Sequence, residues 1–130
     1  MRYVFLLFVF AACDVIDPYP VSDLHWVDGD SGTIDGERFR LADVDAPETR
    51  NADCSAERVL GEEAKNYVRN LTQRGDILVT GDYGADRYGR RVIDLSINGE
   101  NVSSALMEKG YLQSWAHLNG RALERKPDWC

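Results

Sequence analysis

The fold is decided by residues 28–48, which read DGDSGTIDGERFRLADVDAPE. Within this stretch, residues 33–41 alternate apolar and polar side chains on either side of an Asp-Gly pair. That pattern predicts a β-hairpin, because Asp-Gly supplies the tight turn and alternation gives a strand one buried face. Phe39 and Leu41 are expected on the core side of its second strand, with Arg40 on the opposite side.

The rest of the chain alternates between strand and helix patterns. The predicted elements follow in chain order: a strand at 24–28, a helix at 55–73, strands at 77–80 and 92–97, a helix capped by Asn101 and ended by Gly110, and a short helix near 121–125. Ser55 is expected to cap the long helix, with Glu57 in its first turn. This order indicates an α+β fold, a small closed five-stranded β-barrel with helices packed outside.

Length and charge limit the function. With 130 residues and 14.7 kDa, the chain is expected to form one domain with a real core. Its formal net charge of −7 runs against a nucleic-acid partner, since basic surface normally supplies most of that affinity. A nucleic-acid function would therefore need a bound cation, a local basic patch or weak substrate binding.

The first residues form a separate feature. Residues 1–12, MRYVFLLFVFAA, place one arginine before an apolar run that is too short for a transmembrane helix and typical of an export signal. The small residues before Cys13 resemble a bacterial lipoprotein cleavage site, so Cys13 is a candidate for lipidation and membrane anchoring. A misassigned start or an apolar first strand are the alternatives. We expect a signal at 1–12, a linker at 13–23 and one domain at 24–130, in a protein that is periplasmic, envelope-anchored or secreted.

The cysteine count follows from that expectation. If Cys13 is lipidated or lies near a cleavage site, Cys54 and Cys130 remain. An exported chain would be expected to oxidise them to a disulfide, whereas the alternative is two unrelated thiols.

Three acids carry the first candidate chemistry. Asp30, Asp45 and Glu48 offer hard oxygen ligands, which suit Ca²⁺ or Mg²⁺ better than zinc or copper. Carboxylates that gather usually have a cation to offset their repulsion. The alternative is that Asp28-Gly29 is an ordinary turn and that the acids are solvated loop ends.

A second constellation lies at residues 86–91, DRYGRR, between two predicted strands. A guanidinium there would bind phosphate oxygens bidentately, and glycine would permit close backbone approach. Charged residues with glycine are also what any connecting loop contains, so this reading stays open on composition alone.

Together the two stretches resemble the staphylococcal nuclease (thermonuclease) family over roughly residues 24–115. The matching segments are Val27-Asp28-Gly29-Asp30, Phe39-Arg40-Leu41, Val44-Asp45-Ala46-Pro47-Glu48 and Asp86-Arg87-Tyr88-Gly89-Arg90. The resemblance implies an OB-fold barrel of five strands with about three helices and a Ca²⁺-dependent phosphodiesterase site. The segments around Cys54 and Cys130 also look like those of exported bacterial members, which supports their pairing.

The family's roles carry over residue by residue. The resemblance implies metal binding by Asp30, Asp45 and the main-chain carbonyl of Ala46, a general base in Glu48, and catalytic arginines in Arg40 and Arg90. Ala46 replaces the family's threonine and loses its hydroxyl. Ser31 also replaces a threonine, and Gly32 stands where a strand side chain is common.

The substrate is expected to be DNA or RNA. Arg87 and Tyr88 would help hold it, and Trp115 would stack on a base, with a role of Trp115 as a packing anchor as the alternative. The sequence thus predicts an exported, monomeric, Ca²⁺-dependent endonuclease with little sequence specificity. The alternatives are a non-catalytic nuclease-like nucleic-acid-binding module and an envelope Ca²⁺-binding protein.

Overall fold

The computed structural model describes residues 17–130 of the chain. The predicted signal at 1–12 and the candidate lipidation site Cys13 lie outside the described residues. No helix among residues 17–130 combines the length and the apolar character needed to cross a membrane.

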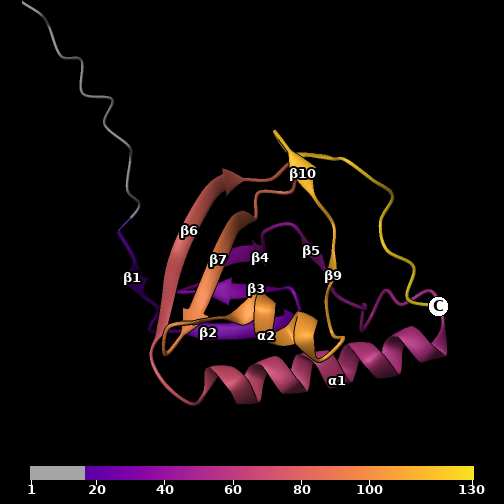
Figure 1. Ribbon diagram of the computed structural model, residues 1–130, viewed down its shortest axis with the longest axis horizontal. Helices are drawn as coiled ribbons and strands as arrows, with labels where there is room; N and C mark the ends of the chain where they lie inside the picture. The colour runs from indigo at the N-terminus through magenta and orange to yellow at the C-terminus, as the bar shows by residue number, and fades with distance from the viewer. Residues whose placement is uncertain (1–16) are drawn as a thin grey trace, which may run out of the picture.

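One curled sheet organises the molecule (Figure 1). Its strands are β1 (Tyr19–Pro20), β2 (Leu24–Asp28), β3 (Ser31–Ile34), β4 (Glu37–Leu41), β6 (Ile77–Ala85), β7 (Arg91–Ile97) and β8 (Glu100–Asn101). They run in the order β1-β6-β7-β4-β3-β2, with β8 beside β7. The predicted α+β, OB-like fold is confirmed, but the sheet is a strongly curled half-barrel, since no ladder within residues 17–130 joins β2 to β6. β1 lies within residues 13–23, which were expected to form a linker, and it pairs with β6 of the sheet.

Two helices pack on the sheet. α1 (Ser55–Thr72) lies beneath β2 and β3 in Figure 1, and α2 (Val102–Glu108) follows β8. Asn101 caps α2 as predicted, because its side chain accepts the Ser104 N–H at 2.9 Å. The expected cap of α1 is wrong by one residue: Cys54, not Ser55, is in the extended cap conformation and accepts the Glu57 N–H.

The predicted third helix near 121–125 is wrong. Residues 117–122 form a hairpin of β10 (His117–Leu118) and β11 (Arg121–Ala122). Its turn is Asn119-Gly120, with φ angles of 49° and 76°. Asn-Gly favours that left-handed pair of conformations, so local turn chemistry prevails over the helical character of Arg121 to Arg125.

A second small ladder connects the barrel to this hairpin. β5 (Val44–Asp45) pairs antiparallel with β9 (Gln113–Ser114), placing Asp45 opposite Gln113. The Trp115 N–H also donates to the Asp43 carbonyl at 2.9 Å. The chain after α2 therefore runs past the segment that carries the predicted metal ligands.

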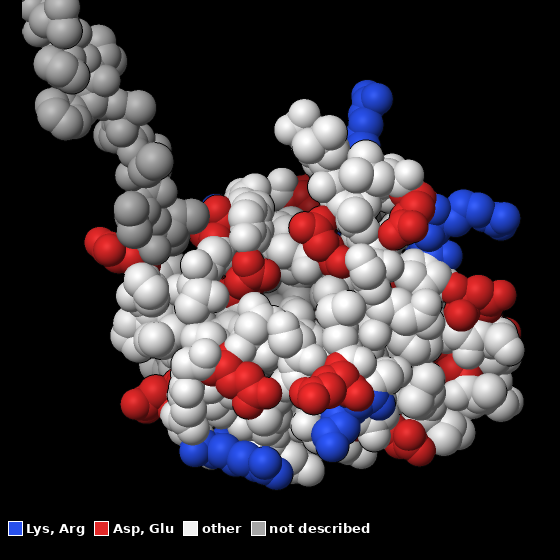
Figure 2. Space-filling model, viewed as in Figure 1, with Lys and Arg blue, Asp and Glu red and all other residues white. Residues whose placement is uncertain are grey.

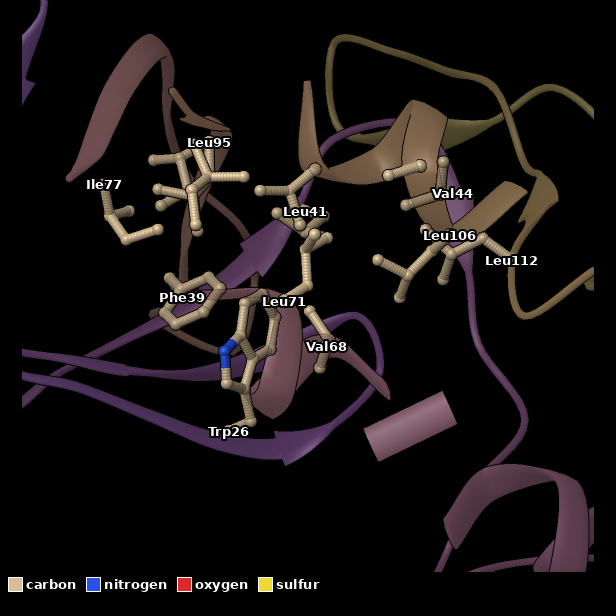
Figure 3. Packing of buried hydrophobic residues seen from close by; sticks show 14 of the residues in the cluster. Trp26, Phe39, Leu41, Val44, Val68, Leu71, Ile77, Leu95, Leu106 and Leu112 are labelled. Atoms are coloured by element: carbon tan, nitrogen blue, oxygen red, sulfur yellow. The ribbon is translucent and has the colours of Figure 1, made fainter. Parts of the chain in front are cut away.

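The core fills the concave side of the sheet (Figure 3). Trp26 and Phe39 meet edge to face with ring centroids 5.2 Å apart. Phe39 and Leu41 are fully buried, as their alternation predicts, and α1 adds Val68 from its inner face. This packing fixes β4, and with it Arg40 on the opposite side of the strand.

The Cys54–Cys130 disulfide is present, so the predicted pairing is confirmed. It joins residues separated by 76 positions and ties the chain end to the start of α1, where Figure 1 shows the C-terminus. A covalent link across so long a loop removes much of the freedom of the unfolded chain.

Replacing both cysteines, Cys54→Ser with Cys130→Ser, should lower the free energy of unfolding by about 2–4 kcal/mol, since the long loop regains its entropy when unfolded. Urea denaturation followed by tryptophan fluorescence measures this difference. Wild-type protein unfolded with a reductant present is the matched control and should coincide with the double variant. A double variant as stable as oxidised wild type would contradict the expectation.

Candidate active site

The predicted acids lie near one another where β2 ends and β5 begins. Asp30 follows β2 in a turn, and its Oδ2 accepts the Ala46 N–H at 2.9 Å. Nearby, Asp28 Oδ1 accepts both the Thr49 N–H and the Thr49 hydroxyl, at 3.2 and 2.7 Å. Asp28 is therefore more than a turn residue, because it anchors the loop after β5 to the turn that presents Asp30.

Helix α1 holds the same loop from the other side. Glu57 is buried, and its carboxylate accepts the Glu48 N–H at 3.1 Å and the Asp53 N–H at 2.7 Å. At Gly61, an added Cβ would lie 2.5 Å from the Glu48 carbonyl oxygen, so only glycine lets the helix approach this closely. The place of Glu57 in the first helical turn predicted an interaction with the helix dipole, and its role in positioning Glu48 was not predicted.

Burial dominates the electrostatics of the acids. It raises the pKa of Asp30, against the opposing effect of the Ala46 N–H, and the charge of Asp45 raises it further. Burial likewise raises the pKa of Asp45 and of Glu48. Burial thus opposes the charged form of each carboxylate, and a nearby cation would favour that form.

Two residues of the chain end, Trp129 and Lys126, supply partners that were not predicted from the sequence. Trp129 Nε1–H donates to Asp45 Oδ2 at 2.8 Å. The Lys126 Nζ lies 3.1 Å from Glu48 Oε1 and 3.7 Å from Asp45 Oδ1. Burial would lower the pKa of Lys126, but the carboxylates outweigh it and raise that pKa, so the ammonium stays charged. The Cys54–Cys130 pairing is the signal that could have placed this segment near Glu48.

Strand pairing brings the two predicted catalytic arginines together. β4 and β7 are parallel, with Arg40 opposite Val92, so Arg90 just before β7 lies near Arg40. The Arg40 guanidinium donates to the Val44 carbonyl at 2.8 Å and lies 5.4 Å from the Trp115 ring centroid. Both arginines line one cavity of about 760 Å³.

Asp86 organises the loop that carries Arg90. Its carboxylate accepts the N–H groups of Tyr88 and Arg90 at 2.9 Å each, and the Arg90 Nε–H at 2.8 Å. Burial alone would raise the pKa of Asp86, but these bonds outweigh it and lower the pKa. Tyr88 in turn lies beneath the guanidinium groups of Arg87 and Arg90, at 4.8 and 5.4 Å.

The cavity combines these arginines with aromatic walls. Tyr88, Trp115 and His117 line it together with Arg121 of the hairpin. Trp115 is half-buried and packs edge to face on His117 at 4.6 Å, so it belongs to the cavity wall and not to the main core. The three acids are not among the lining residues, and Arg40, whose charge acts on Asp30 and Asp45, connects them to the cavity.

Two of the three departures from the family pattern, Ala46 and Gly32, have structural explanations. Ala46 is buried, and its N–H binds Asp30 regardless of its side chain. A Cβ at Gly32 would lie 2.0 Å from the His25 carbonyl oxygen, so this strand position accepts only glycine.

The donor set fits a hard cation with few protein ligands. Within residues 17–130, no three His, Cys, Asp or Glu side chains converge on one metal position. Asp30 and Asp45 each have one oxygen engaged by a hydrogen bond and one oxygen left, which the carbonyl of Ala46 could complement. Oxygen-only donors of this kind suit Ca²⁺ or Mg²⁺. The Lys126 ammonium already lies beside Asp45 as a cation.

A curled OB-like sheet that carries paired arginines at one cavity, with a cluster of acids next to Arg40, is typical of a nuclease-like class of protein. The chain belongs to the staphylococcal nuclease homologue family, whose model matches residues 38–126. Protein ParB of Escherichia coli is 33% identical over 97 residues, covering 67% of this chain and 49% of ParB. The chain thus spans about half the length of that curated relative. Family membership indicates a nuclease-type function.

Gly61→Ala should destabilise the protein although alanine is the better helix former. The helix gains at most about 1 kcal/mol, whereas moving a buried backbone contact costs about 1–3 kcal/mol. Urea denaturation should show a net loss of stability. Asn66→Ala, on the exposed face of α1, is the control and should be neutral or stabilising. A Gly61→Ala protein at least as stable as Asn66→Ala would contradict the close approach.

Asp86→Asn should change the pH dependence of stability. The folded-state pKa of Asp86 lies below its ordinary value of 3.8, so its stabilisation is complete above 3.8 and is lost as pH falls through the folded value. At pH 7 the variant should be less stable by about 0.5–1 kcal/mol. The difference should vanish in strong acid. Urea titrations at several pH values test this, and two parallel stability curves would refute it.

Proposed function

We propose that the protein is a Ca²⁺-dependent endonuclease that hydrolyses phosphodiester bonds of DNA or RNA with little sequence specificity. The observation that carries the proposal is the meeting of Arg40 and Arg90, from distant parts of the chain, at one cavity, with a cluster of carboxylates next to Arg40. Two guanidinium groups with an adjacent acid cluster provide what phosphodiester hydrolysis requires: charge compensation, a cation site and a base.

Asp30, Asp45 and the Ala46 carbonyl would hold the calcium ion. When bound, such an ion polarises a phosphate oxygen and helps to orient water. The fixed hydrogen bonds to Asp30 Oδ2 and Asp45 Oδ2 support this assignment, because they orient both carboxylates before any ligand arrives.

Glu48 would position the attacking water and accept its proton. Its main chain is held by Glu57, and its burial-raised pKa brings the carboxylate closer to the range of an efficient general base. The two arginines would hold the phosphate oxygens as negative charge builds up in the transition state. Asp86 supports that role by fixing the Arg90 guanidinium through its Nε, leaving the terminal nitrogens for a phosphate.

The cavity wall would bind the rest of the substrate. Arg87 and Tyr88 lie at its rim, and Trp115 offers a half-buried indole on which a base could stack. Stacking inside a cavity favours single-stranded or frayed nucleic acid, and it tolerates any base, which agrees with weak sequence preference. On the face that Figure 2 shows, acidic side chains are scattered and no continuous basic surface is present. The arginines that line the cavity would supply local positive charge for the substrate.

We propose further that the protein acts as a monomer outside the cytoplasm, exported by residues 1–12 and either free or anchored through Cys13. The disulfide supports an oxidising compartment, where such bonds persist.

Glu48→Gln should reduce cleavage about 10²–10⁴-fold, since the amide cannot accept a proton from water. Plasmid and single-stranded DNA are incubated with purified protein in Ca²⁺ or in chelator, and products are resolved on gels. Chelator should abolish cleavage by the wild type. Glu62→Gln, on the exposed side of α1, is the control and should cleave normally.

Cleavage that is unchanged by both the chelator and the Glu48 substitution would contradict the mechanism. Absence of cleavage combined with retarded migration of the DNA would favour a non-catalytic binding module in place of an enzyme.

A further inference from the structure

The chain end covers the acid cluster. Residues 124–130, here called the C-terminal tail, leave the β10–β11 hairpin without forming a helix or strand and return to the start of α1 (Figure 1). The Cys54–Cys130 disulfide fixes the far end of the tail. Trp115 Nε1–H donates to the Glu124 carbonyl at 3.2 Å and fixes its near end. The tail is therefore held at both ends across the carboxylates.

Two side chains of the C-terminal tail each contact one oxygen of the Asp45 carboxylate. Trp129 takes Oδ2 at 2.8 Å, while the Lys126 ammonium lies 3.7 Å from Oδ1. The same ammonium is 3.1 Å from Glu48 Oε1. The Asp45 side chain is only 3% exposed, so Lys126 is the charge that compensates it on this side.

We propose that Lys126 is an internal counterion of the carboxylate site, which a divalent cation must displace in order to bind. Asp45 Oδ1 is the oxygen that remains for a metal ion, and Lys126 approaches that same oxygen. A compact ammonium and a metal ion cannot both occupy its inner coordination position. Lys126 thus sets the divalent-ion affinity of the protein below what its carboxylates alone would give.

The disulfide determines how strongly Lys126 competes. A tethered group acts at a high effective concentration, and that concentration falls when the tether is cut. With Cys130 bonded to Cys54, the ammonium stays within reach of Asp45 and Glu48. Without the bond, the tail is free to leave, and the competition should weaken. This inference rests on the proposed metal site at Asp30 and Asp45.

The test is calcium affinity, measured by isothermal titration calorimetry without substrate. Lys126→Met should bind Ca²⁺ about threefold to fivefold more tightly than wild type, the range expected for a partly exposed ion pair. Arg125→Met is the matched control, because it removes the same charge from the neighbouring exposed position. It should change the affinity less than about twofold, since a solvated charge acts only through a screened field.

A second arm repeats the comparison in a chain that carries Cys54→Ser and Cys130→Ser. In that chain, Lys126→Met should leave the Ca²⁺ affinity almost unchanged, because the untethered lysine no longer competes. This coupling distinguishes displacement by a held ammonium from any general change in stability.

The outcomes separate the two proposals. Equal or weaker calcium binding by Lys126→Met, or an equal gain in Arg125→Met, overturns this inference alone. Calcium binding by neither wild type nor Lys126→Met overturns the metal site, and the proposed function and this inference fall with it. Binding that appears only in Lys126→Met would be the strongest support for displacement.

Discussion

The structure depends on keeping Asp30 and Asp45 together in a place sheltered from water. Burial raises the pKa of both, the charge of Asp45 raises that of Asp30 further, and the charge of Glu48 raises that of Asp45, so the fold has to compensate these carboxylates with oriented donors. The Ala46 N–H, the Trp129 indole and the Lys126 ammonium supply that compensation. Because Trp129 and Lys126 come from the far end of the chain, the disulfide that holds this end is part of the site and not only a staple.

The second requirement is a pair of cations at a fixed position beside these anions. The parallel pairing of β4 with β7 provides it, since it aligns Arg40 with the start of the strand that Arg90 precedes. Phe39 and Leu41 bury the other side of β4, so the arginine is placed by core packing. Asp86 then fixes the second guanidinium. Acids, arginines and cavity are thus one unit, in which each part is oriented by the backbone that carries it.

Much of this could be predicted from the sequence because local rules determine it. Alternation around Asp35-Gly36 predicted the hairpin, and helical spacing predicted α1 to within a residue or two. The third helix was wrong because the Asn119-Gly120 turn prevailed over helix propensity. The roles of Lys126 and Trp129 were missed because they depend on contacts between distant segments, which no local pattern encodes. The roles of Glu57 and Asp86 depend on side-chain bonds to nearby main-chain N–H groups, which hydrophobic periodicity does not show. The disulfide was predicted, but the ammonium it brings to Glu48 was not.

The most direct test of the central claim is a crystal structure grown with Ca²⁺ and a hydrolysis-resistant phosphorothioate oligonucleotide. The account predicts one calcium ion between Asp30 and Asp45, with Lys126 moved away from Asp45. It also predicts a bridging phosphate within hydrogen-bond distance of Arg40 and Arg90. An ion bound elsewhere, or a phosphate that contacts neither arginine, would contradict it.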